Sequence, residues 1–144
     1  MRRFGEAVVR NQDYRDRPGV YAIIRQGSDL LVTVQSEPKL EIQLPGGGID
    51  AGESPIPALH RECLEETGWK IRIFRKLGAF QRFTFMPDYN LWAHKICHIY
   101  LGAPTLRVGE PTECHHEAVW MPIDAAAELL GNEGDRHFVS SLLG

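Results

Sequence analysis

The stretch GGIDAGESPIPALHRECLEETGW, residues 47–69, joins a glycine-rich segment to a helix whose two ends are marked in the sequence. Ser54 is a favourable N-cap residue, and Pro55 follows at the first helical position, where proline removes no intrahelical hydrogen bond. Gly68 is the residue type that commonly ends a helix. Together these signals predict a helix over residues 54–67.

Three glutamates of this predicted helix, Glu62, Glu65 and Glu66, share one face. Their i, i+3 and i+4 spacing spans roughly 100° of arc, and neighbours at this spacing have Cβ atoms about 5–6 Å apart. Clustered carboxylates repel each other unless a cation lies among them, and Mg²⁺ prefers oxygen ligands of this kind. Taken alone, however, the spacing is more typical of a solvated acidic face than of a metal site.

The surroundings of the three glutamates favour the metal site. Gly46–Gly48 lies just upstream, and its backbone could offer carbonyl groups to a metal or amides to a phosphate. Glu53 precedes the helix, and Arg61 can hold a carboxylate through two parallel hydrogen bonds. Acids, a flexible glycine loop and an orienting arginine together suit metal-assisted attack of water on phosphorus.

The order of these residues resembles the signature of the Nudix hydrolase family. Five residues separate Gly47 from Glu53 and seven separate Glu53 from Arg61, as in that signature, and the following residues through Gly68 match its Arg-Glu, Glu-Glu and Gly positions. Cys63 and Trp69 stand where the signature has aliphatic residues. Cysteine behaves as a small buried hydrophobe and tryptophan can cap a core edge, so neither departure conflicts with the fold.

The resemblance implies an α/β/α sandwich with a mixed β-sheet, and a substrate in which a nucleoside diphosphate is joined to another group. It implies that Mg²⁺, with Mn²⁺ as a substitute, is bound by the carbonyl of Gly46 and by Glu62, Glu65 and Glu66. Arg61 and Glu53 would orient these ligands, and the Gly46–Gly48 backbone would bind the substrate. The metal would polarise phosphorus and lower the pKa of an attacking water.

The signature leaves the general base open. Some family members use a glutamate in a late loop before the last strand, and Glu117 occupies a similar place before the predicted strand Ala118–Met121. We therefore predict that Glu117 accepts the proton from water, with Glu113 and Glu110 as competitors. The alternative is that all three are ordinary loop acids.

The neighbouring Cys114-His115-His116, with Glu113 and Glu117, could be interpreted as a zinc site. Stable zinc sites usually draw their ligands from separated segments, whereas these residues are contiguous. We therefore interpret this segment as a polar loop near the substrate.

The rest of the chain predicts alternating groups of strands and helices. Two hairpins are expected, one from strands at 20–25 and 30–35 and the other from strands at 71–85 and 94–101. Four further elements are expected: a short strand containing Ile42 and Leu44, a strand at 118–121, a helix capped by Asp124 that runs through Leu130, and a last helix over about 135–143. Pro18-Gly19 predicts a turn. This order suggests a mixed sheet covered by helices on both faces.

The whole chain has the composition of an ordinary globular protein. Its 144 residues suit a single domain, 1–144, with residues 1–17 as a loosely attached arm or an edge segment. A net charge of -3 gives no reason to expect a nucleic-acid polymer as partner. No long apolar run follows the N-terminus, so neither a signal peptide nor a membrane span is expected. Three cysteines without framework spacing fit reduced thiols in a cytoplasm, and a homodimer is compatible with the sequence.

The function implied by the resemblance is a Mg²⁺-dependent pyrophosphohydrolase that cleaves a diphosphate linkage. The alternative is a non-catalytic Nudix domain that binds or senses a nucleotide, although such a domain should have lost some of the acids that this chain retains. Sequence markers of members that cleave NADH, ADP-ribose or coenzyme A are absent. Nucleoside triphosphates (oxidised ones included), dinucleoside polyphosphates and nucleotide sugars remain as candidate substrates.

Overall fold

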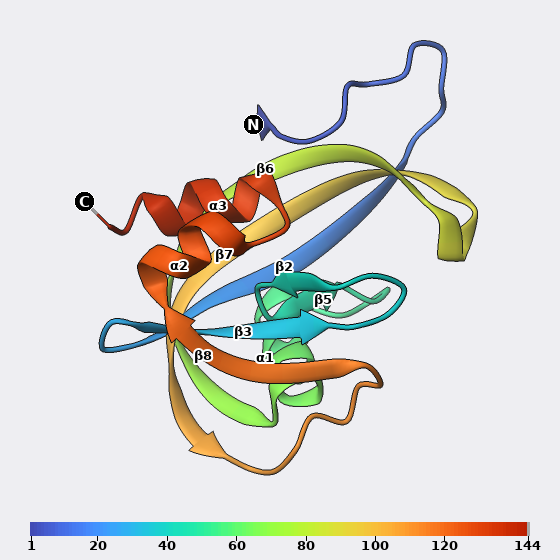
Figure 1. The fold of residues 1–144 in the computed structure, drawn as a ribbon. Coiled ribbons are helices and arrows are strands. Elements are labelled where there is room, and N and C mark those ends of the chain that lie inside the picture. The colour runs from blue at the N-terminus through green and yellow to red at the C-terminus, as the bar shows by residue number, and fades with distance from the viewer. Residues whose placement is uncertain (144) are drawn as a thin grey trace.

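The computed structural model describes residues 1–143, and its strands form one mixed eight-stranded sheet (Figure 1). The path through the sheet is β1-β6-β7-β2-β3-β4, with β5 paired to β2 and β8 paired to β3. β1 pairs in parallel with β6, β2 pairs in parallel with β7, and the other pairs are antiparallel. The predicted α/β fold with a mixed sheet is therefore confirmed.

The elements along the chain are β1 (Arg2–Arg3), β2 (Arg15–Gln26), β3 (Asp29–Gln35), β4 (Glu41–Gln43), β5 (Gly46–Gly48), α1 (Pro55–Thr67), β6 (Trp69–Met86), the 3-10 turn η1 (Pro87–Tyr89), β7 (Leu91–Arg107), β8 (His116–Pro122), α2 (Ile123–Leu129) and α3 (Glu133–Ser140). None of the helices among the described residues has the length and apolar character needed to cross a membrane.

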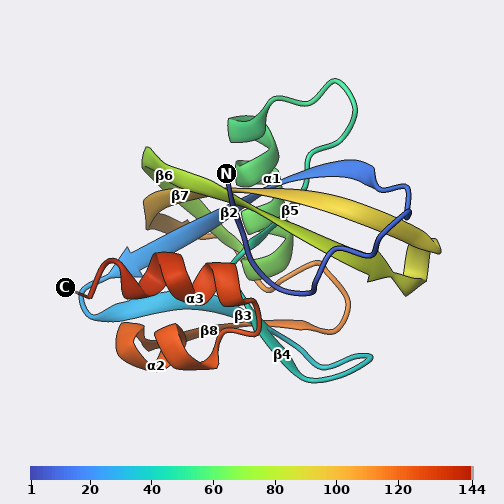
Figure 2. The same cartoon turned by 90° about the horizontal axis from the view of Figure 1, so that it is seen from above.

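Two apolar clusters lie on opposite faces of the sheet, because successive side chains of a strand point to opposite sides. One joins α1 to β2 and β3 through residues that include Leu59, Cys63, Val20, Ala22 and Leu31. The other joins α2 and α3 to the opposite face through residues that include Ala126, Val139, Ile23, Phe80 and Ile99. The helices thus cover both faces, with α1 alone on one side and α2 with α3 on the other (Figure 2).

β2 changes partners along its length, and this change positions the glycine segment. Its residues 19–21 pair with β5, whereas residues 24–26 pair with β3. β3 in turn pairs with β4 through residues 33–35. β3 and β5 thus pair with different parts of the same strand, β2. The chain passes from β4 to β5 at this point, and β5 comes to lie beside α1.

The structure differs from the sequence prediction at several boundaries. Gly46–Gly48 is not a free turn but the strand β5. β2 begins at Arg15 rather than Val20, so Pro18-Gly19 lies within a strand instead of forming a turn. The parallel pairing with β7 carries β2 through this dipeptide, a long-range contact that no local signal reveals.

The C-terminal helices also begin and end differently. The predicted cap of α2, Asp124, lies in its first turn, and the N-cap position belongs to Pro122. α3 covers Glu133–Ser140 rather than 135–143, because the Asn132 side chain accepts a hydrogen bond from the backbone N–H of Gly134 and starts the helix early.

The N-terminal segment has three distinct parts. Arg2–Arg3 pairs with β6 as an edge strand, and Phe4 is buried with its ring edge-on to Phe80. Residues 5–14 are mostly exposed, and residues 15–17 belong to β2.

The C-terminal end of helix α1 makes backbone contacts with the loop that follows β7. Ser54 is the N-cap residue, although its side chain makes no capping hydrogen bond. Gly68 ends the helix with φ 75°, and its N–H donates to the carbonyl of Leu64. Its own carbonyl accepts from Val108 N–H at 2.8 Å, and a Cβ at this position would collide with the Gly109 carbonyl. Gly68 thus joins α1 to the loop after β7.

Gly68→Ala should destabilise the protein more than Gly52→Ala. Both glycines have positive φ, 75° and 79°, so alanine at either position should cost about 1–2 kcal/mol in backbone strain. Nothing lies within 4 Å of a Cβ at Gly52, whereas at Gly68 the backbone of Gly109 must move, which should add about 1–3 kcal/mol. Urea unfolding of both variants measures the difference, and equal losses would show that the Gly109 contact is unimportant.

Candidate active site

The three glutamates of α1 lie beside the glycine strand. Glu66 is 7% exposed, and its Oε1 accepts a hydrogen bond from Gly46 N–H at 2.7 Å. Gly47 faces Glu62 so closely that a Cβ would lie 2.6 Å from the Glu62 carboxyl carbon. Glycine is therefore required at this position because a carboxylate occupies the space of a side chain.

Arg61 connects the acids of this site into one network. Its Nε and Nη2 donate to the two carboxylate oxygens of Glu53 at 2.8 and 2.9 Å, a bidentate pair. Its Nη1 donates to Glu62 at 3.0 Å and to Glu65 at 3.3 Å. Asp50 also approaches Nη2, at 3.4 Å. The guanidinium thus occupies the position of a cation between Glu62 and Glu65.

The buried carboxyls have pKa values above the ordinary range. Burial raises the pKa of Glu66 to about 8, opposed by the hydrogen bond from Gly46 and reinforced by the charges of Glu62 and Glu113. Burial also raises the pKa of Glu62, although Arg61 opposes the shift. In contrast, the hydrogen bond from Arg61 lowers the pKa of Glu53 to about 2. Glu62 and Glu66 are therefore buried without enough nearby positive charge to keep their pKa values in the ordinary range.

The residues present fit a divalent cation, although they do not form a complete ligand cluster. Among residues 1–143, no group of three His, Cys, Asp or Glu side chains is arranged to hold a metal ion. The reason is the position of Arg61, whose Nη1 is shared by Glu62 and Glu65. A cation near Glu62 and Glu66 would supply the positive charge that burial of these oxygens demands.

The loop between β7 and β8 is anchored to the end of α1. The backbone N–H groups of Thr112 and Glu113 both donate to the carbonyl of Glu65, at 2.8 and 3.1 Å. This contact brings Glu113 close enough for its charge to raise the pKa of Glu62 and Glu66.

Glu117 has a different place, on β8. Ala118 and Trp120 pack with the α1 cluster, whereas Val119 and Met121 pack with the cluster on the opposite face. Because side chains alternate along a strand, Glu117 shares the face of Val119, away from α1. Of the late-loop acids considered from sequence, Glu110 pairs with Arg107 at 2.6 Å.

His116 is a member of the site that sequence reasoning did not single out. Its Nδ1 lies 3.6 Å from Glu66 Oε2, is buried, and has no hydrogen-bond partner in the described chain. The only sequence signal was its place in the polar Cys114-His115-His116 loop. Asp50, the further partner of Arg61, was likewise missed, because its role depends on how the loop before α1 folds back.

A family model described as NUDIX domain matches residues 15–142. A CMP-5'-(N-acetyl-N-hydroxy-3-aminopropyl)phosphonate hydrolase from Streptomyces rubellomurinus is 44% identical over 90 residues, covering 61% of this chain and 41% of that protein. A putative 8-oxo-dGTP diphosphatase from Bacillus subtilis is 35% identical, covering 51% of this chain and 50% of that protein. An RNA pyrophosphohydrolase from Ruthia magnifica is 33% identical, covering 66% and 52%. The chain thus spans about half or less of the length of the curated relatives it matches.

Solved structures share the fold. A NUDIX hydrolase from Nitrosomonas europaea superimposes with a TM-score of 0.74 at 19% identity, covering 89% of this chain and 88% of that one. A MutT protein from Methanosarcina mazei gives 0.72 at 23% identity, covering 91% and 95%. Since the family match extends over nearly all the strands and helices described above, the chain belongs to the NUDIX domain family.

Proposed function

We propose that this protein is a divalent-metal-dependent pyrophosphohydrolase that cleaves the diphosphate linkage of a nucleoside diphosphate derivative. The observation that carries the proposal is the packing of β5 against α1. It places the backbone of Gly46 and Gly47 directly on the carboxyls of Glu66 and Glu62. This packing supports the proposal because a backbone that could bind phosphate lies beside carboxylates that could bind a metal.

Glu62, Glu65 and Glu66, with the carbonyl of Gly46, would hold the cation, with Mg²⁺ as the proposed ion and Mn²⁺ as a substitute. When bound, a divalent cation would polarise the diphosphate and lower the pKa of the attacking water. Arg61 and Glu53 act as positioning residues, because the bidentate pair fixes the guanidinium that orients Glu62 and Glu65. The backbone of Gly46–Gly48 would bind substrate phosphate oxygens.

We further propose Glu113 as the general base, in competition with the sequence-based candidate Glu117. Glu113 is tied to α1 through its backbone hydrogen bond to Glu65, and its charge acts on Glu62 and Glu66. Glu117 lies on the face of β8 that α1 does not cover. A general base must be within reach of the attacking water, which favours the acid that stays beside the carboxylate cluster.

The substrate candidates are nucleoside triphosphates, dinucleoside polyphosphates and nucleotide sugars. The relatives named for a CMP-phosphonate and for 8-oxo-dGTP support a small nucleotide. The relative named RNA pyrophosphohydrolase makes the 5' end of RNA a competing substrate. Parallel assays of small nucleotides and 5'-triphosphorylated RNA, with phosphate and pyrophosphate detection, separate these classes.

Removing the metal or its proposed ligand Glu66 should abolish turnover. Chelation should stop hydrolysis, and added Mg²⁺ or Mn²⁺ should restore it. Glu66→Gln keeps an oxygen that can accept from Gly46 but removes a charged ligand, so kcat should fall by about 100-fold or more. Glu128→Gln, which changes an exposed acid of α2, is the control and should leave turnover unchanged. Near-normal turnover of Glu66→Gln with an unaltered fold would refute the ligand assignment.

Glu113→Gln and Glu117→Gln form a matched pair that identifies the general base. If Glu113 accepts the proton, Glu113→Gln should lower kcat by about 10²–10⁴-fold with little change in KM, while Glu117→Gln stays near wild type. The measurement is steady-state kinetics over a range of pH, where loss of the base should also remove the acidic limb of the profile. The reverse pattern would return the role to Glu117.

A further inference from the structure

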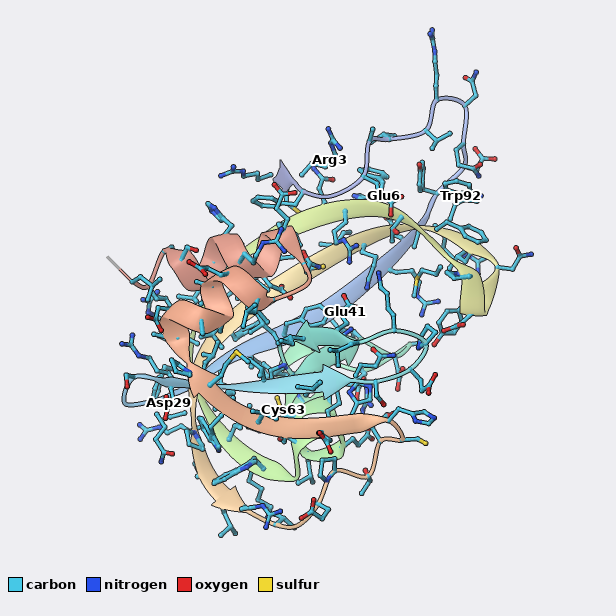
Figure 3. The ribbon with its side chains drawn as sticks, in the orientation of Figure 1. Arg3, Glu6, Asp29, Glu41, Cys63 and Trp92 are labelled. Atoms are coloured by element: carbon cyan, nitrogen blue, oxygen red, sulfur yellow. The ribbon has the colours of Figure 1, made fainter. Side chains whose placement is uncertain are left out.

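A polar cavity lies on the other side of β5 from the carboxylate cluster. Its volume is about 160 Å³, and its wall includes Gly46 and Gly47, the residues that contact Glu66 and Glu62. Tyr21 of β2 and Asp135 of α3 also line it. Glu41, the first residue of β4, also lines it and is labelled in Figure 3. A molecule bound there would be separated from the catalytic carboxylates by a single strand.

Asp135 is an unpaired acid facing this cavity. The residue is 6% exposed, and its carboxylate has no hydrogen bond or ion pair with any of residues 1–143. Burial raises its pKa to about 7, opposed by the charges of Arg82 and Lys95. Among the described residues, the only fully buried side-chain polar atom without a partner is His116 Nδ1, so the Asp135 oxygens are open to the cavity, where a bound ligand could donate to them.

The position of Asp135 in the first turn of α3 offers a simpler explanation, the favourable field at a helix N-terminus. An exposed acid achieves that stabilisation without losing its hydration, and Glu133 in the same turn is exposed. The helix field therefore accounts for an acid in this turn but not for the burial of Asp135.

Lys95 adds a donor to the same cavity. It is a half-buried residue of β7, and burial lowers its pKa. Its ammonium group has no hydrogen bond to another part of the described chain. Arg82 of β6 is opposite Lys95 in the strand register and also lines the cavity. The cavity thus presents an acceptor group on one side and cationic donors on another.

The volume of the cavity limits the size of the ligand that it can hold. Sites for whole small molecules usually measure about 300–1,000 Å³, so a cavity of about 160 Å³ suits one planar ring system. A neighbouring cavity of about 180 Å³ shares Tyr21, Gly47 and Lys95 and adds Arg17 and Gly48. It offers room for a sugar and a phosphate on the way to the glycine strand.

We propose that the cavity beside Asp135 binds the guanine base of the substrate, with Asp135 accepting from N1–H and the N2 amino group and Lys95 donating to O6. The proposal rests on the nucleotide hydrolysis proposed above. A carboxylate offers two adjacent acceptors, and guanine presents two adjacent donors, with O6 as acceptor beside them. Adenine and cytosine place a ring-nitrogen acceptor beside the amino group, and uracil places carbonyl oxygens on both sides of its N–H. While Asp135 is ionised, each of these three bases would leave one of its oxygens facing an acceptor.

Binding of nucleoside monophosphates in the presence of EDTA tests the base site apart from catalysis. By calorimetry at a pH well above the pKa of Asp135, GMP should bind at least about 10-fold more tightly than AMP, CMP or UMP. IMP, which lacks only the 2-amino group, should bind less tightly than GMP by a similar factor. Equal binding of all bases, a preference for another base, or equal binding of IMP and GMP would overturn the proposal. This comparison uses the wild-type protein, so it does not depend on the folding of a variant.

Asp135→Asn should change which base the cavity prefers and not only weaken the binding of nucleotides. An amide presents one donor and one acceptor, which matches xanthine, where an oxygen replaces the 2-amino group. GMP binding should therefore fall by about 100-fold and XMP binding should rise above that of the wild type. Glu133→Gln removes the other acid of the same helical turn and should change neither. A loss that falls equally on GMP and XMP would overturn the role of Asp135.

The outcomes separate this inference from the proposed reaction. Base-selective binding without metal-dependent hydrolysis would refute the pyrophosphohydrolase function and leave the guanine site standing. Metal-dependent hydrolysis without base-selective binding would support the pyrophosphohydrolase function and refute the guanine site.

Discussion

The hydrogen bond from Gly46 N–H to the buried carboxyl of Glu66 is the contact on which the arrangement of the site depends. It joins the glycine strand to the middle of the acidic helix face across 20 residues of sequence. A buried carboxyl without a donor would be strongly unfavourable, so the helix and the strand must stay in register. The rest of the site is placed relative to this pair, since Gly47 then lies on Glu62, while Glu65 precedes Glu66 directly and Arg61 lies one turn earlier in α1.

The apolar face of α1 holds the acidic face in position. Cys63, labelled in Figure 3, stands between Glu62 and Glu65 in the sequence. Its side chain is fully buried and packs on the sheet together with Leu59. Because residues three and four apart on a helix share a face, burying this stripe turns the polar residues toward β5 and the loop after β7. The cysteine that replaces an aliphatic residue of the signature fills the same role as a small hydrophobe, and burial raises the pKa of its thiol.

β5 is shared between two environments, and this explains why glycine stands at two of its positions, Gly46 and Gly47. One side of the strand touches the α1 carboxyls and the other borders the cavity that contains Asp135. Side chains there would separate the two spaces and block the approach of a ligand backbone or phosphate. Under the two proposals above, the same strand would connect the reacting end of a nucleotide to its base through a rigid element rather than through a flexible loop.

The sequence by itself determined α1, its glycine stop and the grouping of Glu62, Glu65 and Glu66, because these depend on local caps and on the helical period. It also indicated Arg61 and Glu53, whose spacing is characteristic of the family signature. The strand character of Gly46–Gly48 and the extension of β2 through Pro18-Gly19 were decided by pairing with distant strands. Likewise, only the tertiary structure placed His116 beside Glu66, turned Glu117 away from α1, and gathered Asp135, Lys95 and Arg82 around one cavity. Such placements depend on register and on which face of a strand a residue occupies, and a shift of one position reverses every side chain.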